Sequence, residues 1–393
     1  MFNIRIRGRR IFFTPNRRLA ISVSNRIPES EVFLYKSEEP ITYVTTTTTE
    51  PPIALYYLAG DFTSYQSVSA NYLVKVEDTG TRISEFVSSA INICRKTVFD
   101  NQSSIYGIVC GNTTPKQELF LLETFDPTGT EYTGTIGQSF WIDQLFDGSV
   151  LIGTERGLVR RTYTDSGIWS LIYNSRILGF EVDHINETIF SVGGFTSGPF
   201  GSQNRISSAN FDGTQNLQFV VGTGFNGEPI KIRKFGDNYL VVGAFTTYKG
   251  VSANRIIMID KFGDRVTSFD MGTGFNGTTR EVLVDGNDIY VFGDFTTYKG
   301  VAANRIIKLD ANGNRDVSFV CSFNNLTFCG AKDVVNNRIL VGHRSTEVNS
   351  TSIPRGICAL NLDGSLDVSF NPGSGMSGGF SGGDVYHINI QYI

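Results

Sequence analysis

Residues 245–260 read FTTYKGVSANRIIMID, and residues 295–310 repeat them almost letter for letter as FTTYKGVAANRIIKLD. The preceding GTGFNG at residues 222–227 returns in the same way at residues 272–277. This constant offset of 50 residues marks an internal repeat. Repeats of this length indicate an array of one supersecondary unit that cannot bury its apolar face alone.

One unit of this repeat contains four short runs that are rich in β-branched and aromatic residues. They cover residues 230–234, 239–245, 255–259 and 266–269, and turn-forming residues, many of them glycine, stand between them. Such runs are typical of strands joined by tight turns. Four strands in each unit predict the blade of a β-propeller, in which neighbouring sheets pack face to face around a central axis.

The number of units follows from the glycine that ends the second strand. It recurs at seven positions, so we expect seven blades, although two of these units depart from the motif and rest on spacing alone. The glycines are Gly60, Gly111, Gly153, Gly193, Gly243, Gly293 and Gly342, of which Gly111 and Gly153 mark the divergent units. Structural phenylalanines follow at Phe62, Phe195, Phe245 and Phe295, and a fourth-strand phenylalanine recurs at Phe86, Phe219, Phe269, Phe319 and Phe370.

The two ends of the repeat region complement each other. Residues 386–393 read YHINIQYI, which predicts the first strand of a further blade, after which the sequence stops. The first unit, in contrast, begins directly at its second strand, residues 54–60. We therefore expect the C-terminal strand to complete the first blade, which would remove the open edges of the first and last sheets.

Residues 1–44 lie outside the repeat and are expected to form a small β-rich docking module. Residues 1–28 hold seven arginines and no acidic residue, so with a net charge of -4 the remaining residues carry -11. Alternating apolar letters at residues 4–13 and 19–23 predict one or two strands, and the alternative is a solvated tail. Residues 45–52 form a Thr/Pro-rich spacer, and residues 53–393 the propeller. The candidate docking residues are Arg5, Arg7, Arg9, Arg10, Arg17 and Arg18.

The composition, with 40% hydrophobic residues and 42 glycines, is typical of a turn-rich globular chain. No run approaches a membrane span, and the first residues lack the apolar core of a secretory signal. The odd number of cysteines shows no metal-binding spacing and predicts free buried thiols in a reducing cytoplasm; they are Cys94, Cys110, Cys321, Cys329 and Cys358. We expect no cofactor, and nucleic acid is not an expected partner.

Few residues form a pattern that is typical of catalysis. The three histidines, His184, His343 and His387, stand alone in the sequence, and solitary histidines on strand-rich stretches are usually structural. Residues 165–169 (DSGIW) resemble the Asp box of sialidase-type propellers, but the box is one residue short and occurs once. Since no arginine cluster or Tyr/Glu pair can be assigned either, we expect a protein that is not an enzyme.

Residues 310–316 (DANGNRD) resemble a calcium-binding loop, with oxygen-bearing side chains at alternate positions. The same place in the preceding unit, residues 260–266, reads DKFGDRV, and its Lys261 and Phe262 cannot coordinate a metal. The element common to the units is therefore a hairpin turn in which glycine takes a positive φ.

An Asn-Arg pair recurs in three units and allows two interpretations. It could form a row of ligand-binding groups on one rim, or a scaffold in which each arginine binds an acidic or carbonyl partner and each asparagine makes a local turn. Identical use around a ring favours the scaffold. The arginines are Arg205, Arg255 and Arg305.

The motif of residues 293–319, Gly-x-Phe-Thr-x-Tyr-x-Gly followed by Asn-Arg-Ile and Asp-x-x-Gly-x-x-Asp-x-Ser-Phe, resembles the delta-sixty repeat. The resemblance is close over residues 193–319, recognisable over 60–86 and in the last unit, and absent from about 95 to 175. It implies a propeller fold without catalytic residues, of a kind found in bacterial surface proteins and in bacteriophage virion proteins. A short N-terminal module with a Thr-rich spacer is similar to tail, fibre or accessory proteins of phage particles.

Three classes of function remain open. The first is a virion protein, present in multiple copies in a symmetric assembly, that docks on other virion proteins through its N-terminal module and offers the propeller to a host-surface glycan or protein. The second is a bacterial carbohydrate- or protein-binding propeller, and the third a propeller hydrolase or lyase. We expect the first, with the irregular loops 193–203 and 372–383 as contact surfaces, because loops on rigid scaffolds commonly carry binding.

Overall fold

The structure is a computed structural model. It describes residues 2–6, 9–13, 33–35, 52–84, 93–99, 105–110, 117–121, 131–132, 139–145, 149–161, 167–379 and 381–393. The chain divides into two compact units, Met1–Pro51 and Pro52–Ile393. The described residues form strands and turns, and none of them belongs to a helix that could cross a membrane.

The first unit contains a small antiparallel sheet with the strand order β2-β1-β3. Its strands are β1 (Phe2–Ile6), β2 (Arg9–Phe13) and β3 (Phe33–Tyr35). The alternating apolar letters predict β1 and β2, which pair with Ile4 opposite Ile11. They do not predict β3, and the strand expected at residues 19–23 lies outside the described residues.

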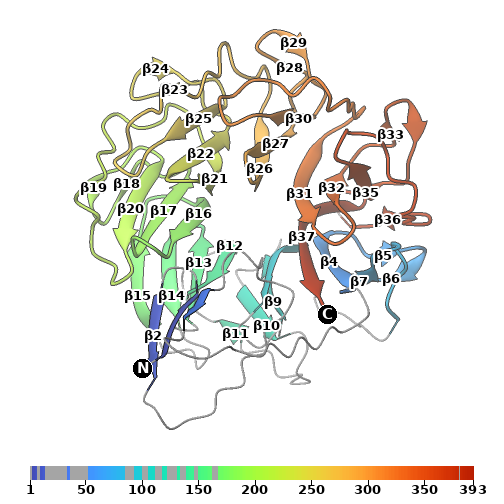
Figure 1. Ribbon diagram of the computed structural model, residues 1–393, viewed down its shortest axis with the longest axis horizontal. Helices are drawn as coiled ribbons and strands as arrows, with labels where there is room; N and C mark the ends of the chain where they lie inside the picture. The colour runs from blue at the N-terminus through green and yellow to red at the C-terminus, as the bar shows by residue number, and fades with distance from the viewer. Residues whose placement is uncertain are drawn as a thin grey trace. The chain divides into compact units, whose positions relative to one another are not determined.

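The second unit is an all-β arrangement of sheets around a central axis, as in a β-propeller (Figure 1). Four-stranded sheets are formed by β8 (Ile93–Phe99), β9 (Ile105–Cys110), β10 (Gln117–Leu121) and β11 (Glu131–Tyr132), and by β12 (Ser139–Gln144), β13 (Val150–Thr154), β14 (Gly157–Arg161) and β15 (Gly167–Ile172). Three-stranded sheets are formed by β16 (Ile177–Asp183), β17 (Thr188–Gly193) and β20 (Ile206–Asn210); by β21 (Pro229–Phe235), β22 (Asn238–Gly243) and β25 (Ile256–Ile259); by β26 (Thr279–Asp285), β27 (Asp288–Gly293) and β30 (Ile306–Leu309); by β31 (Thr327–Asp333), β32 (Arg338–His343) and β35 (Gly356–Asn361); and by β37 (Asp384–Tyr392), β4 (Ala54–Asp61) and β7 (Leu73–Glu77).

Short hairpins connect the second strand of a repeat unit to its third. In β23 and β24 the turn residues Lys249 and Gly250 have φ values of 49° and 78°, as a two-residue hairpin turn requires. The hairpin strands are β5 (Ser64–Tyr65), β6 (Val68–Ser69), β18 (Ser197–Gly198), β19 (Gly201–Ser202), β23 (Thr247–Tyr248), β24 (Val251–Ser252), β28 (Thr297–Tyr298), β29 (Val301–Ala302), β33 (Glu347–Val348) and β34 (Thr351–Ser352), and β36 (Met376–Ser377) pairs with β5.

The prediction of a fourth strand at residues 266–269 is wrong. After the bridge between Ile259 and Arg265, the N–H of Val266 still bonds to Met258 O (2.9 Å), but the N–H of Phe269 bonds back to Val266 O (3.3 Å). This turn ends the ladder and carries the Phe269 side chain into the core, where it is 2% exposed. Four-stranded sheets, β8–β11 and β12–β15, occur instead in the two divergent repeat units, which contain Gly111 and Gly153.

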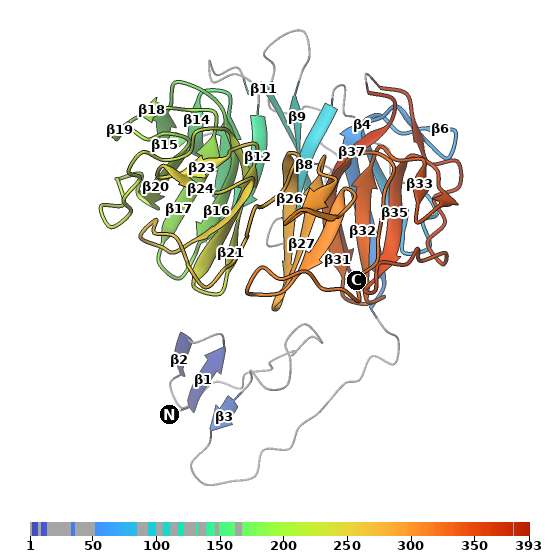
Figure 2. The ribbon, with the colours of Figure 1, turned by 90° about the horizontal axis from the view of Figure 1, so that it is seen from above.

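The first strand of each sheet lies nearest the axis and contacts the equivalent strand of the next sheet. The contacts run from β8 to β12, β16, β21, β26, β31 and β37, and β37 contacts β8. Figure 2 shows β26, β31 and β37 side by side. The strand β37 also pairs antiparallel with β4, from Tyr392 opposite Ala54 to Asp384 opposite Asp61.

The repeated phenylalanines and tyrosines form the core of the outer part of the repeat units. Phe245 is fully buried, and its ring centroid lies 4.4 Å from that of Phe225, which in turn lies 4.5 Å from the ring of Tyr248. The Tyr248 hydroxyl donates a hydrogen bond to Gly263 O (2.7 Å) and ties the hairpin to the next turn. The same contacts recur around Phe295, and Phe62 and Phe195 are also fully buried.

Candidate functional site

A β-bulge interrupts each strand that lies nearest the axis in the described part of the second unit. A bulge inserts one residue without a partner in the neighbouring strand, so it can turn that side chain in a new direction. In β26, for example, Thr279 pairs with Gly293 and Glu281 with Phe292, which leaves Arg280 unpaired. The bulged residues are Arg95, Phe140, Leu178, Ile230, Arg280, Phe328 and Tyr386.

In four repeat units the repeated glycine lies opposite this bulge, as Gly60, Gly193, Gly243 and Gly293. A Cβ atom on Gly243 would lie 2.3 Å from Glu228 O, and one on Gly293 would lie 2.3 Å from Thr278 O, so a side chain cannot be accommodated without moving the backbone. Gly60 and Gly193 are equally close to a carbonyl oxygen of their partner strand, at 2.1 Å. In these four units the repeated glycine therefore marks the bulge, whereas Thr154 and His343 take the equivalent position next to Gly153 and Gly342.

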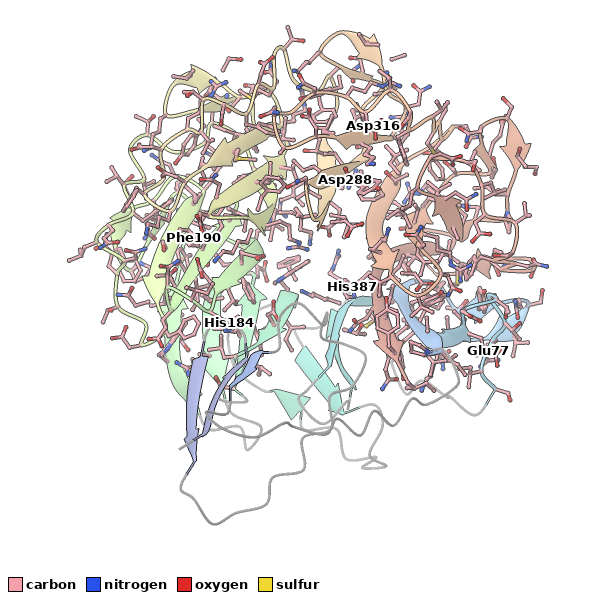
Figure 3. All side chains as sticks on the ribbon, in the orientation of Figure 1. Glu77, His184, Phe190, Asp288, Asp316 and His387 are labelled. Carbon is pink, nitrogen blue, oxygen red and sulfur yellow. The ribbon has the colours of Figure 1, made fainter. Side chains whose placement is uncertain are left out.

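The seven bulged residues line one cavity of about 330 Å³, together with Lys231, Leu326 and Arg344. Each of the strands nearest the axis thus contributes a side chain to the same cavity. Leu178, Ile230 and Leu326 are its aliphatic residues, whereas Arg95, Arg280 and Arg344 bring guanidinium groups. Figure 3 shows the side chains of the second unit around the axis, with His387, the residue after Tyr386, labelled on β37.

Two of the three guanidinium groups are held by carboxylates. Arg280 binds Asp294 through Nε (2.8 Å) and Nη2 (2.9 Å), and Arg344 binds Asp384 through the same two nitrogens. Both pairs keep the guanidinium planes in place, because two parallel hydrogen bonds fix their orientation. The Arg344 and Arg280 groups also lie 5.4 and 5.6 Å from the centroid of the Phe328 ring.

Arg95 differs from these two arginines. Its guanidinium carbon lies 5.6 Å from the ring centroid of Phe140 and 5.7 Å from that of Tyr386, so it rests between two aromatic rings. No described carboxylate forms an ion pair with it, and its buried Nε has no hydrogen-bond acceptor among the described residues. Within the described part of the chain, Arg95 therefore brings an unmatched positive charge to the cavity.

A second layer of buried charge lies around Trp141, one residue beyond the bulge Phe140. The Nζ atoms of Lys96 and Lys231 lie 3.3 and 3.5 Å from the Trp141 ring centroid, and burial lowers the pKa of these lysines to about 7 and about 8. Glu281 is 7% exposed at its side chain and lies 3.0 Å from Arg233 and 4.0 Å from Lys231.

The strand nearest the axis is also where the two most similar repeat units differ most. Residues 228–234 read EPIKIRK, while residues 278–284, fifty positions later, read TTREVLV and share no residue with them. The hairpin and third strand of the same units are almost identical. In these two units the scaffold is therefore repeated, whereas the residues of the strand nearest the axis differ.

The structure places the candidate docking arginines only in part. Arg5 lies in β1, and Arg9 and Arg10 lie in β2, with side chains outside the described set. Arg7, Arg17 and Arg18 lie outside the described residues, as do Gly111 and Phe86 of the predicted repeat.

The repeated arginines bind backbone carbonyls at the junction with the next unit. Arg205 donates to Phe225 O (2.8 Å) and Arg255 to Phe275 O (2.7 Å), whereas Arg305 donates to Asp294 O within its own unit. All three have φ near 70°, at 73°, 69° and 73°. They do not reach the cavity.

The loops expected to be contact surfaces lie outside the cavity lining as well. Residues 193–203 include the hairpin β18–β19, and residues 372–383 include β36, which pairs with β5. Residues 310–316 form the predicted turn, in which Gly313 has a φ of 80° and the Asp310 carboxylate accepts the N–H groups of Asn312 (2.9 Å) and Asn314 (2.8 Å).

The histidines and cysteines are distributed through the core. His387 accepts a hydrogen bond from the N–H of Thr97 (3.4 Å), and no group of metal-binding residues occurs among the described ones. The prediction of free buried thiols is confirmed for the cysteines whose side chains are described, Cys94, Cys321, Cys329 and Cys358. Asp165 of the incomplete Asp box lies outside the described residues.

Part of the chain is similar to a known β-propeller family. Residues 287–319 match a family model described as "Domain of unknown function (DUF5122) beta-propeller". The chain is similar to the WD40 beta propeller domain of Doa1, with a TM-score of 0.49 and 12% identity over 75% of this chain and 95% of that one. It is also similar to a protein of unknown function from Bacteroides caccae, with a TM-score of 0.40 and 11% identity over 81% and 92%. No curated protein matches the chain.

The matched segment begins just before β27 and ends at Phe319, so it covers scaffold and none of the cavity residues. The sequence does not predict the cavity, although it contains an indirect signal. That signal is the sequence difference between repeat units in the strand nearest the axis, as between residues 228–234 and 278–284. The cavity presents cations and aromatic rings, and this combination suits the binding of an anion or a polar ring.

Proposed function

We propose that the second unit is a closed propeller of seven blades. The contacts between the strands nearest the axis support this, because they lead from β8 through the other sheets to β37 and back to β8. One core cluster also joins Tyr56 and Leu58 of the first sheet to Leu340 and Ile357 of the last repeat unit.

A repeated hydrogen bond gives further support for closure. Between two central sheets, the Tyr239 hydroxyl donates to Asp183 (2.5 Å). The Tyr56 hydroxyl of β4 donates to Asp333 of β31 in the same way, and Arg338 donates to that hydroxyl (2.7 Å). The first sheet therefore packs on the last as a central sheet packs on its neighbour.

We propose that this propeller is a binding protein and not an enzyme, and that its ligand occupies the axial cavity. The proposal rests on the observation that each strand nearest the axis contributes one bulged side chain to the cavity. A scaffold contact would be repeated from unit to unit, as Phe245 and Phe295 are, whereas the seven bulged residues are of five kinds, with Arg and Phe in two units each and Leu, Ile and Tyr in one each. Volumes of about 300–1,000 Å³ are usual for small-molecule sites, and this cavity lies within that range.

The titratable groups of the cavity do not form a complete acid–base pair. General acid–base chemistry needs a proton donor and acceptor with pKa values suited to the reaction. Burial lowers the pKa of Lys231 to about 8, but Asp294 and Asp384 are engaged by arginines, and burial raises the pKa of the Tyr386 hydroxyl. The arginine cluster that a sialidase-type site would need is present, but Tyr386 lies beside Asp384 (3.5 Å) and not beside a glutamate.

We further propose that the protein is a bacteriophage virion component, attached to other virion proteins through residues 1–44 and present in several copies. The resemblance of residues 193–319 to the delta-sixty repeat and the opposite charges of the two units support this location. A bacterial carbohydrate- or protein-binding propeller is the alternative, and it would use the same cavity without a particle. Mass spectrometry of purified particles tests the location, and recovery of the chain only as a cytosolic monomer contradicts it.

Blocking the cavity tests the binding function. Ile230→Trp places a larger side chain in the cavity, and we expect fluorescently labelled chain carrying it to lose binding to host cells. Ile185→Trp is the matched control, because Ile185 is 85% exposed and does not line the cavity. Equal binding by both variants, with unchanged melting curves, would place the binding surface elsewhere.

A further inference from the structure

We propose that the axial cavity selects a ligand that carries a single carboxylate on a compact, ring-sized body. This inference rests on the proposed binding function and specifies the chemistry of the ligand. It follows from the number of unmatched charges, from the hydrogen-bond donors that remain available and from the aliphatic residues of the lining.

The first step concerns charge. Of the three guanidinium groups in the lining, those of Arg280 and Arg344 are neutralised by carboxylates, and Arg95 has no such partner among the described residues. Lys231 lies 4.0 Å from Glu281, which also lies 3.0 Å from Arg233, and Arg233 lies 3.9 Å from Glu181, so these two cations face two carboxylates. One full unmatched charge suits a monovalent anion, whereas a phosphate dianion would leave an uncompensated negative charge in a partly buried site.

The second step concerns hydrogen bonds. The carboxylates of Asp294 and Asp384 occupy Nε and Nη2 of their arginines, so the Nη1 group of each remains as a donor. Arg95 adds its own donors from β8. Because a guanidinium fork matches the planar geometry of a carboxylate, these donors favour that group over a neutral hydroxyl.

The third step concerns size. A cavity of about 330 Å³ lies at the lower end of the range for small-molecule sites, so it has room for one ring and not for a chain of rings. Leu178, Ile230 and Leu326 provide apolar contacts for the body of the ligand. Both a sugar acid and an apolar ring acid meet these requirements, and the test distinguishes them.

Isothermal titration of the full-length chain with three probes tests the proposal. The probes are glucuronate, cyclohexanecarboxylate and glucose, and we expect at least one of the two acids to bind and glucose to bind much more weakly. Tighter binding of glucuronate would identify a sugar acid as the ligand class, and tighter binding of cyclohexanecarboxylate an apolar acid. Loss of one charged hydrogen bond should weaken the binding of the acid about ten- to hundred-fold in Arg95→Gln. Arg265→Gln is the control, because Arg265 lies outside the cavity and bonds to Ser252 O (3.2 Å).

A second pair of variants keeps the proposal testable if Arg95→Gln does not fold. Ile230→Glu and Ile230→Gln have nearly the same size and both remove the apolar contact of Ile230, but only the first adds a carboxylate, so the acids should bind much more weakly to the Glu variant than to the Gln variant. Binding of glucose as tight as that of the tighter-binding acid, or equal binding by the Glu and Gln variants, would overturn the carboxylate assignment but leave the cavity as a binding site. Absence of binding by all three probes would also overturn it. Failure of the proposed binding function would appear separately, as unchanged cell binding by Ile230→Trp.

Discussion

His343 is a titratable residue that the fold buries completely. Its ring is 0% exposed and lies 5.4 Å from that of Phe323, and burial lowers its pKa to about 4. Burial and the neighbouring Lys96 and Lys231 also lower the pKa of His387. Both residues are isolated histidines in the sequence. Their pKa values depend on burial and neighbouring charges, which only the fold determines.

The buried histidine predicts a loss of stability in mild acid. The pKa of His343 is lower in the folded chain than its ordinary value of 6.5, so between pH 6.5 and pH 4 the unfolded chain binds more protons. Its stabilising effect is complete above pH 6.5 and falls by about 3 kcal/mol as the pH approaches 4. Urea unfolding of the wild type and of His343→Gln at pH 7 and pH 4.5 should show a smaller pH dependence in the variant. The same pH dependence in both proteins would assign the acid sensitivity to other groups.

At the scale of the element, the strands of one unit have different tasks. The second strands, such as β22 and β27, are buried over almost their whole length and hold the sheets together. The strands nearest the axis alternate between core and axis, and one bulge in each directs a further side chain into the cavity. Substitutions along the second strand should therefore affect stability, and those at the bulge should affect binding.

The strand β37 provides the prediction at this scale. A chain that ends at Ser381 lacks the strand that pairs with β4, so Tyr56 and Leu58 lose their neighbours and an edge of the sheet is exposed. We expect this chain to unfold or aggregate, as judged by circular dichroism and size-exclusion chromatography. A chain that ends at Tyr392 is the control, because Ile393 is 64% exposed. A melting temperature of the shorter chain equal to that of the full chain would contradict closure through β37.

At the scale of the whole molecule, the chain consists of two compact units with different charge. Residues 1–51 hold eight Lys and Arg and five Glu, a net charge of +3, so residues 52–393 carry -7 of the total of -4. The core clusters of described residues lie entirely within the second unit. The second unit should therefore fold without the first.

Removal of the first unit should separate folding from assembly. We expect a chain that begins at Glu50 to melt cooperatively and yet fail to enter the particle. Replacement of Arg9, Arg10, Arg17 and Arg18 with serine should weaken assembly without changing the melt, and added salt should have the same effect because exposed charges are screened over about 10 Å at 0.1 M. Serine at Arg265 and Arg315 is the control. Normal incorporation of the shortened chain would move the docking surface to the propeller.

The sequence by itself determined the repeat, the all-β class and the propeller. These features are visible because the spacing of apolar residues and the positions of glycine are set by local backbone geometry, which every unit shares. The same local geometry marks the turn at residues 310–316 and the short hairpins. The absence of a fourth strand at residues 266–269 could not be predicted in this way, because the turn at Phe269 places its side chain in the core, which is formed by several sheets.

Only the tertiary structure decided the site. The cavity takes one residue from each of several strands that are far apart in the sequence, and no local motif connects Arg95, Arg280 and Tyr386. Whether such a residue faces the axis depends on the bulge, which exists only in relation to the partner strand. The orientation of the Arg280 and Arg344 guanidinium groups likewise depends on their ion pairs with Asp294 and Asp384, which only the fold brings close to them. The repeated residues thus predict the scaffold. The site is formed by residues outside the repeated motif, and these come together only when the sheets are arranged around one axis.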